Sequence, residues 1–439
     1  MSLKDKACLI FKPSRVKSGK AYSFRGEDFT FTRTGVATRY NEDGKIEEVA
    51  GGIPRLNYDP ADLTKCPHLL LEDSRTNRIS NGMNLGSLSK ASVVTIDGQE
   101  SPDALPEKGV KLNVNTSTGA ASYLSTSFSV TNGTKYTVSI YAKAGEFMSF
   151  NFHHYGSAGI KVNLQTGEVV HNAGDTTYGT KYVGNGWYRV WMTWTSSQTS
   201  SDSVYISPTR IPTDNYSSTT STIGEGIYVY GLQAEPYVSK PTSLIKTTGS
   251  TVTRDDDTVT ASSPITGDRG SFYFNLSKMD TTGYGTGVPT IALYKTNTTT
   301  GAIGLLDNNT TQGEMRAIAR INGTLYYYNT HFSAPNGVKM CFVWDSNDSE
   351  TKAYKNGVLW GTIGVSFTQT LSNGLVLNAS TRENFLEYEE VAVYNERLSE
   401  AEAIALTSYD DYQELVDRND LTWESPTITN NRLTALKEL

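Results

Sequence analysis

Short runs with a period of two constrain the fold of this chain more than any other feature. The pattern is clearest at 136–141, 187–194 and 272–276, where large apolar or aromatic residues occupy alternate positions. Alternate residues of a strand point to opposite faces of a sheet, so each run predicts a strand with one buried face. Glycine- and asparagine-rich turns separate the runs, and helical periods are rare. The sequence therefore predicts antiparallel sheets, not a helical bundle.

Composition supports this fold class and argues against several functions. The chain has 439 residues with 37% hydrophobic and 19% charged residues, and 26 Tyr against 14 Phe, as in short strands joined by polar turns. A net charge of −7 argues against a general nucleic-acid binder. No apolar run approaches the roughly 18 residues of a membrane helix, and no secretory signal is visible. Three distant cysteines indicate reduced thiols, and no histidine pairs with a cysteine at zinc-ligand spacing.

Two blocks of alternating strands predict two tandem jelly-roll β-sandwiches. The first block covers 86–245 and the second covers 259–408, with a polar linker at 246–258. Within the second block, Asn356-Gly357 predicts a hairpin tip, and Ser399 with Glu402 predicts a capping box that begins a helix. Because 259–408 contains its own strands and helix, we expect it to fold without residues 1–245.

The two ends of the chain read differently. Residues 1–85 are irregular and poor in apolar anchors, which predicts an extended docking or oligomerisation segment, with a trimer favoured. Residues 409–439 are acidic and predict a short C-terminal tail. The first 20 residues carry six basic side chains against Asp5, a local charge of +5, which fits either a solvated terminus or an arm that docks on an acidic partner. These docking candidates are Lys4, Lys6, Lys12, Arg15, Lys17 and Lys20.

Several stretches, taken in order, resemble virion proteins of tailed bacteriophages. In that family an Arg-Thr-Asn follows an apolar strand and precedes a jelly roll similar to carbohydrate-binding modules, and a laminin-G-like or concanavalin-type sandwich follows. The stretches that carry the resemblance to the first part are 31–38, 69–77, 136–143, 186–190, 229–235 and 247–254. Those that resemble the second sandwich are 354–357 and 391–400.

The resemblance implies a structural component of a phage particle: a tail fibre, a head fibre or a decoration protein. Its implied partners are other virion proteins and host-surface polysaccharide, with no nucleic acid and no membrane. The implied location is the virion, after synthesis in the cytoplasm of the host bacterium. The resemblance leaves open whether the protein is a glycan-binding adhesin or a structural adaptor, and it implies no cofactor.

Aromatic residues are the candidates for glycan binding, because sugars stack their C–H faces on aromatic rings. Trp187 and Trp191 share one face of a strand and predict such a platform. The alternative is that a loop or the neighbouring domain covers both indoles. The further candidates are His153, His154 and Tyr155 on a nearby strand or turn, and Tyr327 in the second sandwich.

Catalysis and metal binding are the remaining possibilities. Glu387 and Glu389 have the spacing of the carboxylates in concanavalin-type glycosidases, so a polysaccharide depolymerase is the alternative function. Ala392 stands where the second principal carboxylate of those enzymes belongs, and we therefore expect no enzyme. The aspartates of 255–257 and 345–348 are of the type that calcium prefers, but such clusters more often form turns, so no metal is expected.

Overall fold

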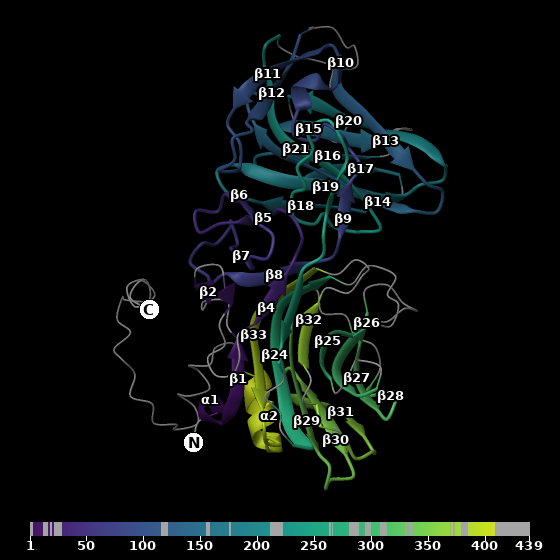
Figure 1. Cartoon of the computed structure of the whole chain (residues 1–439). Helices are drawn as coiled ribbons and strands as arrows, with labels where there is room; N and C mark the ends of the chain where they lie inside the picture. Colours follow the sequence, from purple (N-terminus) through teal and green to yellow (C-terminus); the bar gives the residue numbers. More distant parts are fainter. Residues whose placement is uncertain are drawn as a thin grey trace.

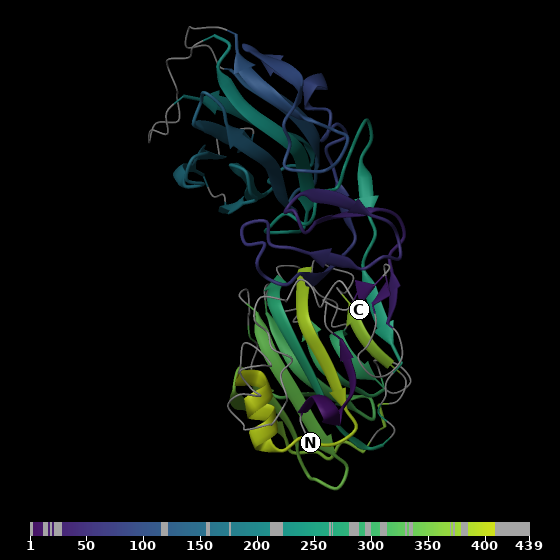
Figure 2. The same cartoon turned by 90° about the vertical axis from the view of Figure 1, so that its left-hand side faces the viewer.

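The computed structural model describes residues 3–11, 16–17, 20–21, 29–115, 122–154, 159–174, 177–210, 223–262, 265, 267–280, 289–294, 300–307, 314–329, 332, 337–368, 370–371, 374–378 and 385–408. The protein is all-β, as predicted, with antiparallel sheets stacked into sandwiches. Figures 1 and 2 show the jelly roll at one end, the second sandwich at the other, and part of the N-terminal segment between them. In the described part of the chain, no helix has the length and apolarity needed to span a membrane.

The jelly roll consists of two six-stranded sheets packed face to face. Large apolar side chains from both sheets, such as Phe150, Phe152 and Ile140, meet in a buried core. The first sheet contains, in spatial order, β10 (Ser89–Ala91), β13 (Tyr123–Val130), β20 (Ser200–Thr209), β15 (Ser149–His154), β16 (Gly159–Asn163) and β17 (Val169–Ala173). The second contains β11 (Val93–Gln99), β12 (Gly109–Val114), β21 (Gly226–Pro236), β14 (Lys135–Ala144), β19 (Trp187–Thr195) and β18 (Thr177–Tyr182).

The second sandwich has an eight-stranded and a seven-stranded sheet. The larger sheet runs β31 (Val358–Ile363), β30 (Thr351–Lys355), β29 (Val338–Asp345), β24 (Arg269–Asp280), β33 (Phe385–Tyr394), β8 (His68–Glu72) and β7 (Arg55–Asn57), with β1 (Ala7–Phe11) also paired to β33. The smaller sheet runs β28 (Thr324–Tyr327), β27 (Met315–Ile321), β26 (Ala302–Asp307), β25 (Pro289–Tyr294), β32 (Gly374–Asn378), β23 (Thr258–Ala261) and β4 (Thr30–Thr32).

The N-terminal segment is therefore part of the second sandwich. Strands β1, β4, β7 and β8 complete both of its sheets, and Leu9, Phe11 and Leu71 enter its core. The second sandwich is therefore not built from 259–408 alone, and we expect that block not to fold without these strands, because they pair with its edges and supply core side chains. The segment had few apolar anchors in sequence because its anchors are spread over short strands. The rest of it forms α1 (Leu3–Lys6), β2 (Val16–Lys17), β3 (Lys20–Ala21), β5 (Ala37–Tyr40) and β6 (Ile46–Val49).

The jelly roll is inserted into the second sandwich. The chain enters it through β9 (Arg75–Asn77) and leaves it through β22 (Val252–Arg254), and these two strands pair antiparallel. The short helix η2 (Leu85–Ser87) follows the entry, and α2 (Glu400–Ser408) closes the second sandwich. Asn77 links the entering strand to the returning chain, because its amide donates a hydrogen bond to the carbonyl of Ile245. The same amide also donates to the carbonyl of Leu232 in β21. The chain therefore passes between the two sandwiches at one place.

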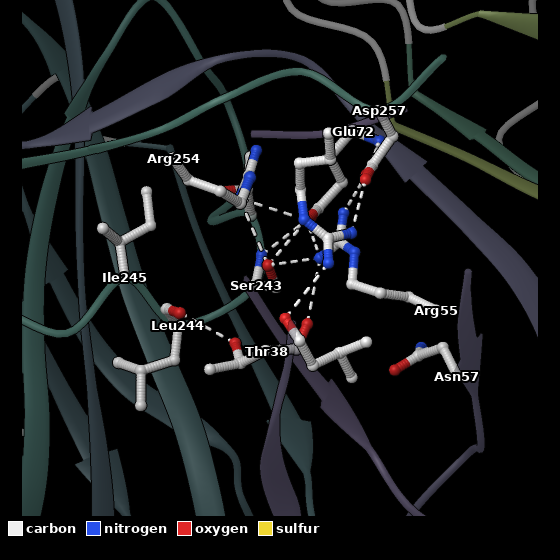
Figure 3. A network of polar contacts seen from close by, with 12 residues as sticks. Thr38, Arg55, Asn57, Glu72, Ser243, Leu244, Ile245, Arg254 and Asp257 are labelled. Atoms are coloured by element: carbon white, nitrogen blue, oxygen red, sulfur yellow. Dashed lines mark hydrogen bonds and ion pairs between the residues drawn. The ribbon is translucent and has the colours of Figure 1, made fainter. Parts of the chain in front are cut away.

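A buried ionic junction lies beside this crossing (Figure 3). Arg55 contacts the carboxylates of both Glu72, at 2.7 Å, and Asp257. Arg254 lies 3.1 Å from Glu72, and Arg33 lies 2.8 Å from Asp257. All five side chains are almost completely excluded from solvent. A buried charge is stable only when it is paired and hydrogen-bonded, so this network fixes how the segments of the junction sit together.

The buried ionic junction contains side chains from three of the stretches that resemble phage virion proteins. Arg33 comes from 31–38, Glu72 from 69–77 and Arg254 from 247–254, and these stretches, far apart in sequence, meet in one network of ion pairs. The hydroxyl and backbone N–H of Ser243 both donate to Glu72, which joins the returning chain of the jelly roll to the same network. The three charged side chains that these stretches contribute are therefore structural, and none of them is exposed for a ligand.

Candidate functional site

The two outer faces of the jelly roll have different surroundings. On the sheet that contains β14 and β19, Tyr141, Trp187 and Tyr230 form a buried cluster with Ile46 and Leu244. Ile46 belongs to the N-terminal segment, and Leu244 belongs to the chain that returns to the second sandwich. This face is therefore the contact between the jelly roll and the rest of the protein. The other sheet contributes no residue to this cluster.

The predicted tryptophan platform is on the covered face. Trp187 is only 1% exposed, so its interpretation as a glycan-stacking ring is wrong, and the alternative that neighbouring chain covers it is correct. Trp191 is half-buried and lies against Gly179 of β18, where an added Cβ would come within 2.2 Å of the indole. A glycine in the adjacent strand thus makes room for Trp191, which packs on its own sheet.

The opposite sheet presents a different set of side chains to the outside. Its strands send Phe152, Ile160 and Ile206 into the core, which turns their neighbours outward. The strand register aligns these neighbours in rows across the sheet. One row contains Tyr205, His153 and Gly159, and the next contains Ser207, Asn151, Lys161 and His171. We call this surface, together with Tyr123 at its β13 side, the outer face.

Three rings pack against one another on the outer face. His153 stacks on Tyr205 with ring centroids 4.8 Å apart and planes 11° apart. Tyr123 meets Tyr205 edge to face at 5.0 Å. Gly159 allows this arrangement, because a Cβ there would lie 2.3 Å from the Cβ of His153. Burial lowers the pKa of His153 to about 4, so the imidazole is neutral and aromatic in character near neutral pH.

Polar side chains lie beside these rings. Asn151 and Lys161 are buried although they are on the outward side of the sheet, and His171 is half-buried. Desolvation lowers the pKa of Lys161 from its ordinary value. Ser203 and Ser207 are half-buried on the neighbouring strand. The outer face thus combines half-buried rings with the half-buried hydroxyls of Ser203 and Ser207 and the imidazole of His171, whereas Asn151 and Lys161 are covered.

The other aromatic candidates lie elsewhere. His154 points to the core side, where it stacks on Trp194 at 4.3 Å with planes 4° apart and its Nδ1 lies 3.5 Å from Asp202. Tyr155 is outside the described residues. Tyr327 is in β28 of the second sandwich, 43% exposed, with the Arg316 guanidinium 4.5 Å from its ring centre. Of the predicted glycan-binding residues that the structure describes, only His153 is on the outer face.

The N-terminal basic residues are only partly described. Lys6 contacts Glu402 at 2.6 Å and Glu396 at 3.3 Å, so its acidic partner is within the same chain. Desolvation opposes the charged form, but the hydrogen bond to Glu402 leads the contributions that raise the pKa of Lys6. The other five predicted docking residues have no described side chain: Lys4, Lys12, Arg15, Lys17 and Lys20.

Neighbouring side chains form ion pairs and hydrogen bonds with the two predicted carboxylates, Glu387 and Glu389. Glu387 is 2% exposed and lies 3.4 Å from Lys278, and His68 lies 3.8 Å from it. His68 also contacts Glu389 at 3.2 Å, and the amide of Asn275 donates to Glu389 at 2.6 Å. The hydrogen bond from His68 is the leading cause that lowers the pKa of Glu389. Both carboxylates therefore have side-chain partners within the protein.

The aspartate clusters also have structural roles. Asp257 is in the ionic junction, and Asp345 accepts hydrogen bonds from the backbone and side chain of Asn347 in a turn. Within the described ranges, no group of three or more His, Cys, Asp or Glu side chains is placed to hold a metal ion.

The sequence did not single out most of the outer face. Tyr123, Tyr205, Asn151, Lys161 and His171 were all missed. A signal exists at 201–207, where serine, tyrosine and serine alternate with aspartate, valine and isoleucine. That alternation marks a strand with a hydroxyl-rich outward face. Its neighbours across the sheet follow from strand pairing, which the sequence does not reveal.

Comparison with known proteins gives distant structural likenesses. No protein-family model matches the chain, and no curated protein matches it. The CBM40 of the Ruminococcus gnavus IT-sialidase bound to α2,3-sialyllactose is similar over 33% of this chain and 84% of that chain, with 15% identity and a TM-score of 0.25. A putative carbohydrate-binding protein from Bacteroides ovatus is similar over 66% of this chain and 80% of that chain, with 11% identity and a TM-score of 0.23.

A phage protein is among the likenesses. A tail fiber protein from a phage of E. coli is similar over 75% of this chain and 41% of that chain, with 11% identity and a TM-score of 0.19. At such low TM-scores, none of these likenesses supports an inference about ligand or partner. The chain is an all-β protein of stacked β-sandwiches.

Proposed function

We propose that this protein is a glycan-binding component of a bacteriophage particle and that the outer face of its jelly roll holds the sugar. The stack of His153 on Tyr205, beside Tyr123, carries this proposal. The three half-buried rings offer apolar surface to the C–H groups of a sugar, and the half-buried hydroxyls of Ser203 and Ser207 can hydrogen-bond to sugar hydroxyls. One ring contributes on the order of 1 kcal/mol, so affinity for a single chain is modest.

Multivalency makes a modest site effective. Several copies on one particle raise avidity by roughly 10²–10⁴ without new contacts. We therefore also propose a homo-oligomer, with a trimer favoured, associated with other virion proteins in a tail fibre, a head fibre or a decoration. The resemblance of stretches such as 69–77 and 247–254 to phage virion proteins supports this part. Light scattering of the purified protein tests the oligomer, and a monomer would contradict it.

We propose binding, not catalysis. Glu387 and Glu389 are engaged by Lys278, His68 and Asn275, which supports a structural role for the pair. The depolymerase alternative predicts that the purified protein shortens host polysaccharide and that Glu387→Gln abolishes this activity. Our proposal predicts unchanged polymer length by size-exclusion chromatography after prolonged incubation.

A variant with a matched control tests the glycan site. Tyr205→Ser removes the central ring of the outer face, and Tyr178→Ser removes a tyrosine that is 44% exposed on the edge strand of the other sheet. Both proteins are applied to an array of bacterial surface polysaccharides. We expect Tyr205→Ser to lose binding and Tyr178→Ser to bind as the unmodified protein does. Absence of binding by the unmodified protein, or equal binding by both variants, would contradict the proposal.

A further inference from the structure

The loop between β11 and β12 joins the jelly roll to the N-terminal segment. The backbone N–H of Ile46 in β6 donates to the carbonyl of Pro102 at 3.3 Å, and the N–H of Ala104 donates to the carbonyl of Ile46 at 2.9 Å. Asp103 lies between these two bonds, in a parallel bridge with Ile46. Leu105 of the same loop belongs to the buried cluster that contains Ile46. We call this junction between the loop and β6 the Ile46 contact.

The carboxyl group of Asp103 is only half satisfied inside this contact. The residue is 7% exposed. The hydroxyl of Ser101 donates to its Oδ1 at 2.7 Å, whereas Oδ2 is buried and has no hydrogen-bond partner in the described part of the chain. A buried oxygen without a partner is costly, and it costs more when the group carries a charge. The Ile46 contact therefore favours the neutral, protonated acid.

The ionisable groups around this carboxyl group do not compensate for its burial. In its own loop, the charge of Lys108 favours the ionised form and that of Glu107 opposes it. Lys246, on the returning chain, lies 2.8 Å from Glu107 and 2.9 Å from Glu48 of β6, so two other carboxylates share its ammonium. Burial raises the pKa of Tyr141 in β14, so its hydroxyl remains neutral and supplies no charge.

From this geometry we propose that the Ile46 contact is a pH-sensitive switch, which tightens when Asp103 takes up a proton and loosens when it ionises. Desolvation is the leading cause that raises the pKa of Asp103 from 3.8 to about 6, and the opposing effects of Ser101 and Lys108 are smaller. An acid whose pKa is raised in the closed contact stabilises it at low pH, and this stabilisation is lost as the pH rises from 3.8 through about 6. Because Trp187 is in the same cluster as Ile46, the pH sets how firmly the covered face of the jelly roll is held.

Hydrogen exchange of the Ala104 amide in the full chain measures this equilibrium, because that N–H is donated across the contact. The quantity compared is the protection factor, which is corrected for the intrinsic pH dependence of exchange. At about pH 5, one unit below the raised pKa, the closed contact holds the proton and the open one does not. We expect protection about tenfold higher there than at about pH 7.5. Equal protection at the two pH values would overturn the proposal.

Two variants assign the pH dependence to one side chain. Asp103→Asn keeps the size of the side chain and the oxygen that accepts from Ser101, and it cannot ionise. Glu48→Gln is the matched control, since it removes a carboxylate of β6 that pairs with Lys246. We expect the tenfold difference to vanish in Asp103→Asn and to persist in Glu48→Gln. The opposite pattern, or the same pH dependence in both variants, would contradict the assignment to Asp103.

A direct titration does not depend on a variant folding. The unmodified chain is labelled with carbon-13 at its aspartate carboxyl groups, and their NMR signals are followed as the pH changes. We expect one signal to titrate with a midpoint near pH 6, as the burial of Asp103 requires. If every aspartate signal titrates near the ordinary 3.8 or below, Asp103 ionises freely in the folded protein and the proposal is overturned.

Discussion

The two sandwiches of this protein are built from the chain in different ways. The strands of the jelly roll all come from one stretch, between β9 and β22, whereas the second sandwich takes β1, β4, β7 and β8 from before that stretch and the rest from after it. The jelly roll is thus a continuous insert, and its host is discontinuous. Because the two crossings pair with each other, the ends of the insert are adjacent, which is the usual condition for a tolerated insertion.

This difference separates the proposed ligand-binding face from the segment that completes the second sandwich. The jelly roll packs the sheet that contains Trp187 against the N-terminal segment. Its outer face is on the other sheet and lies away from that segment. The second sandwich takes four strands from the N-terminal segment, and β33 pairs with two of them end to end on one edge, with β8 along 385–388 and with β1 along 391–394. We infer that changes in the N-terminal segment act mainly on the host, and that changes on the outer face act mainly on binding.

The largest expected effect comes from separating the two parts. A fragment of residues 75–254 retains the jelly roll, the β9–β22 pair and Asn77, and we expect it to melt cooperatively. A fragment of residues 255–439 lacks β1, β4, β7 and β8, and we expect no cooperative transition, because the loss exceeds the roughly 5–15 kcal/mol of a typical domain. Calorimetry of both fragments checks this. A cooperative melt of the second fragment would show that the host does not need the N-terminal strands.

The second-largest expected loss of stability comes from a substitution in the buried ionic junction between the two sandwiches. Arg55→Met leaves Glu72 and Asp257 buried without this partner, and we expect a loss of about 3–5 kcal/mol in the stability of the full chain. The matched control is Arg39→Met, since the Arg39–Glu47 pair at 2.6 Å is partly exposed. Exposed pairs contribute about 0–1 kcal/mol. Chemical denaturation measures both, and similar losses would mean that the junction is no more than a surface ion pair.

Aromatic substitutions compare the covered face of the jelly roll, around Trp187, with its outer face, around Tyr205. Trp187→Ala opens a cavity in the covered face and should cost about 3–5 kcal/mol. Tyr205→Ser removes aromatic pair contacts on the outer face, each of about 0.5–1.5 kcal/mol, so the fold should survive. Melting curves and array binding together test this comparison. The expected result is a destabilised protein for Trp187→Ala and a folded protein without glycan binding for Tyr205→Ser.

Local signals in the sequence predicted local structure well. The hairpin tip at Asn356-Gly357 has positive φ at both residues, 47° and 84°, as its turn type requires. The capping box is present, with Ser399 and Glu402 hydrogen-bonded to each other in both directions. These features depend only on backbone angles and hydrogen bonds among residues that are neighbours in sequence.

Non-local features could not be predicted in the same way. A period of two indicates that one face of a strand is buried, but it does not say what covers the other face. Trp187 and Tyr205 are both aromatic residues on strands of one jelly roll, and Trp187 is inaccessible because it packs in a cluster with residues from elsewhere in the chain, such as Ile46. Likewise, β1 pairs Leu9 with Val393 at the far end of the sequence. Pairing over such separations depends on the whole fold.

The smallest of these effects is the pH dependence that Glu72 gives to the buried ionic junction. Burial by itself raises the pKa of Glu72, but the charges of Arg254 and Arg55 and hydrogen bonds from Ser243 outweigh it and hold the pKa at about 2, below the ordinary 4.5. A carboxyl group with a depressed folded pKa contributes stability that is fully present above pH 4.5 and is lost as the pH falls toward 2. The shift corresponds to roughly 3 kcal/mol.

We therefore expect the full chain to lose stability between pH 4.5 and pH 2 through Glu72, a window that follows from its two pKa values. Glu72→Gln is destabilised at neutral pH, because it removes the charge that faces Arg55 and Arg254, and the part of the pH dependence due to Glu72 should vanish in it. The fragment 75–254 lacks Glu72 altogether, so its melting temperature should lack this contribution as well. Melting curves at half-unit pH steps for the three proteins separate the contributions. An equal acid loss in the fragment and in the full chain would place the sensitive group inside the jelly roll and remove the junction as its source.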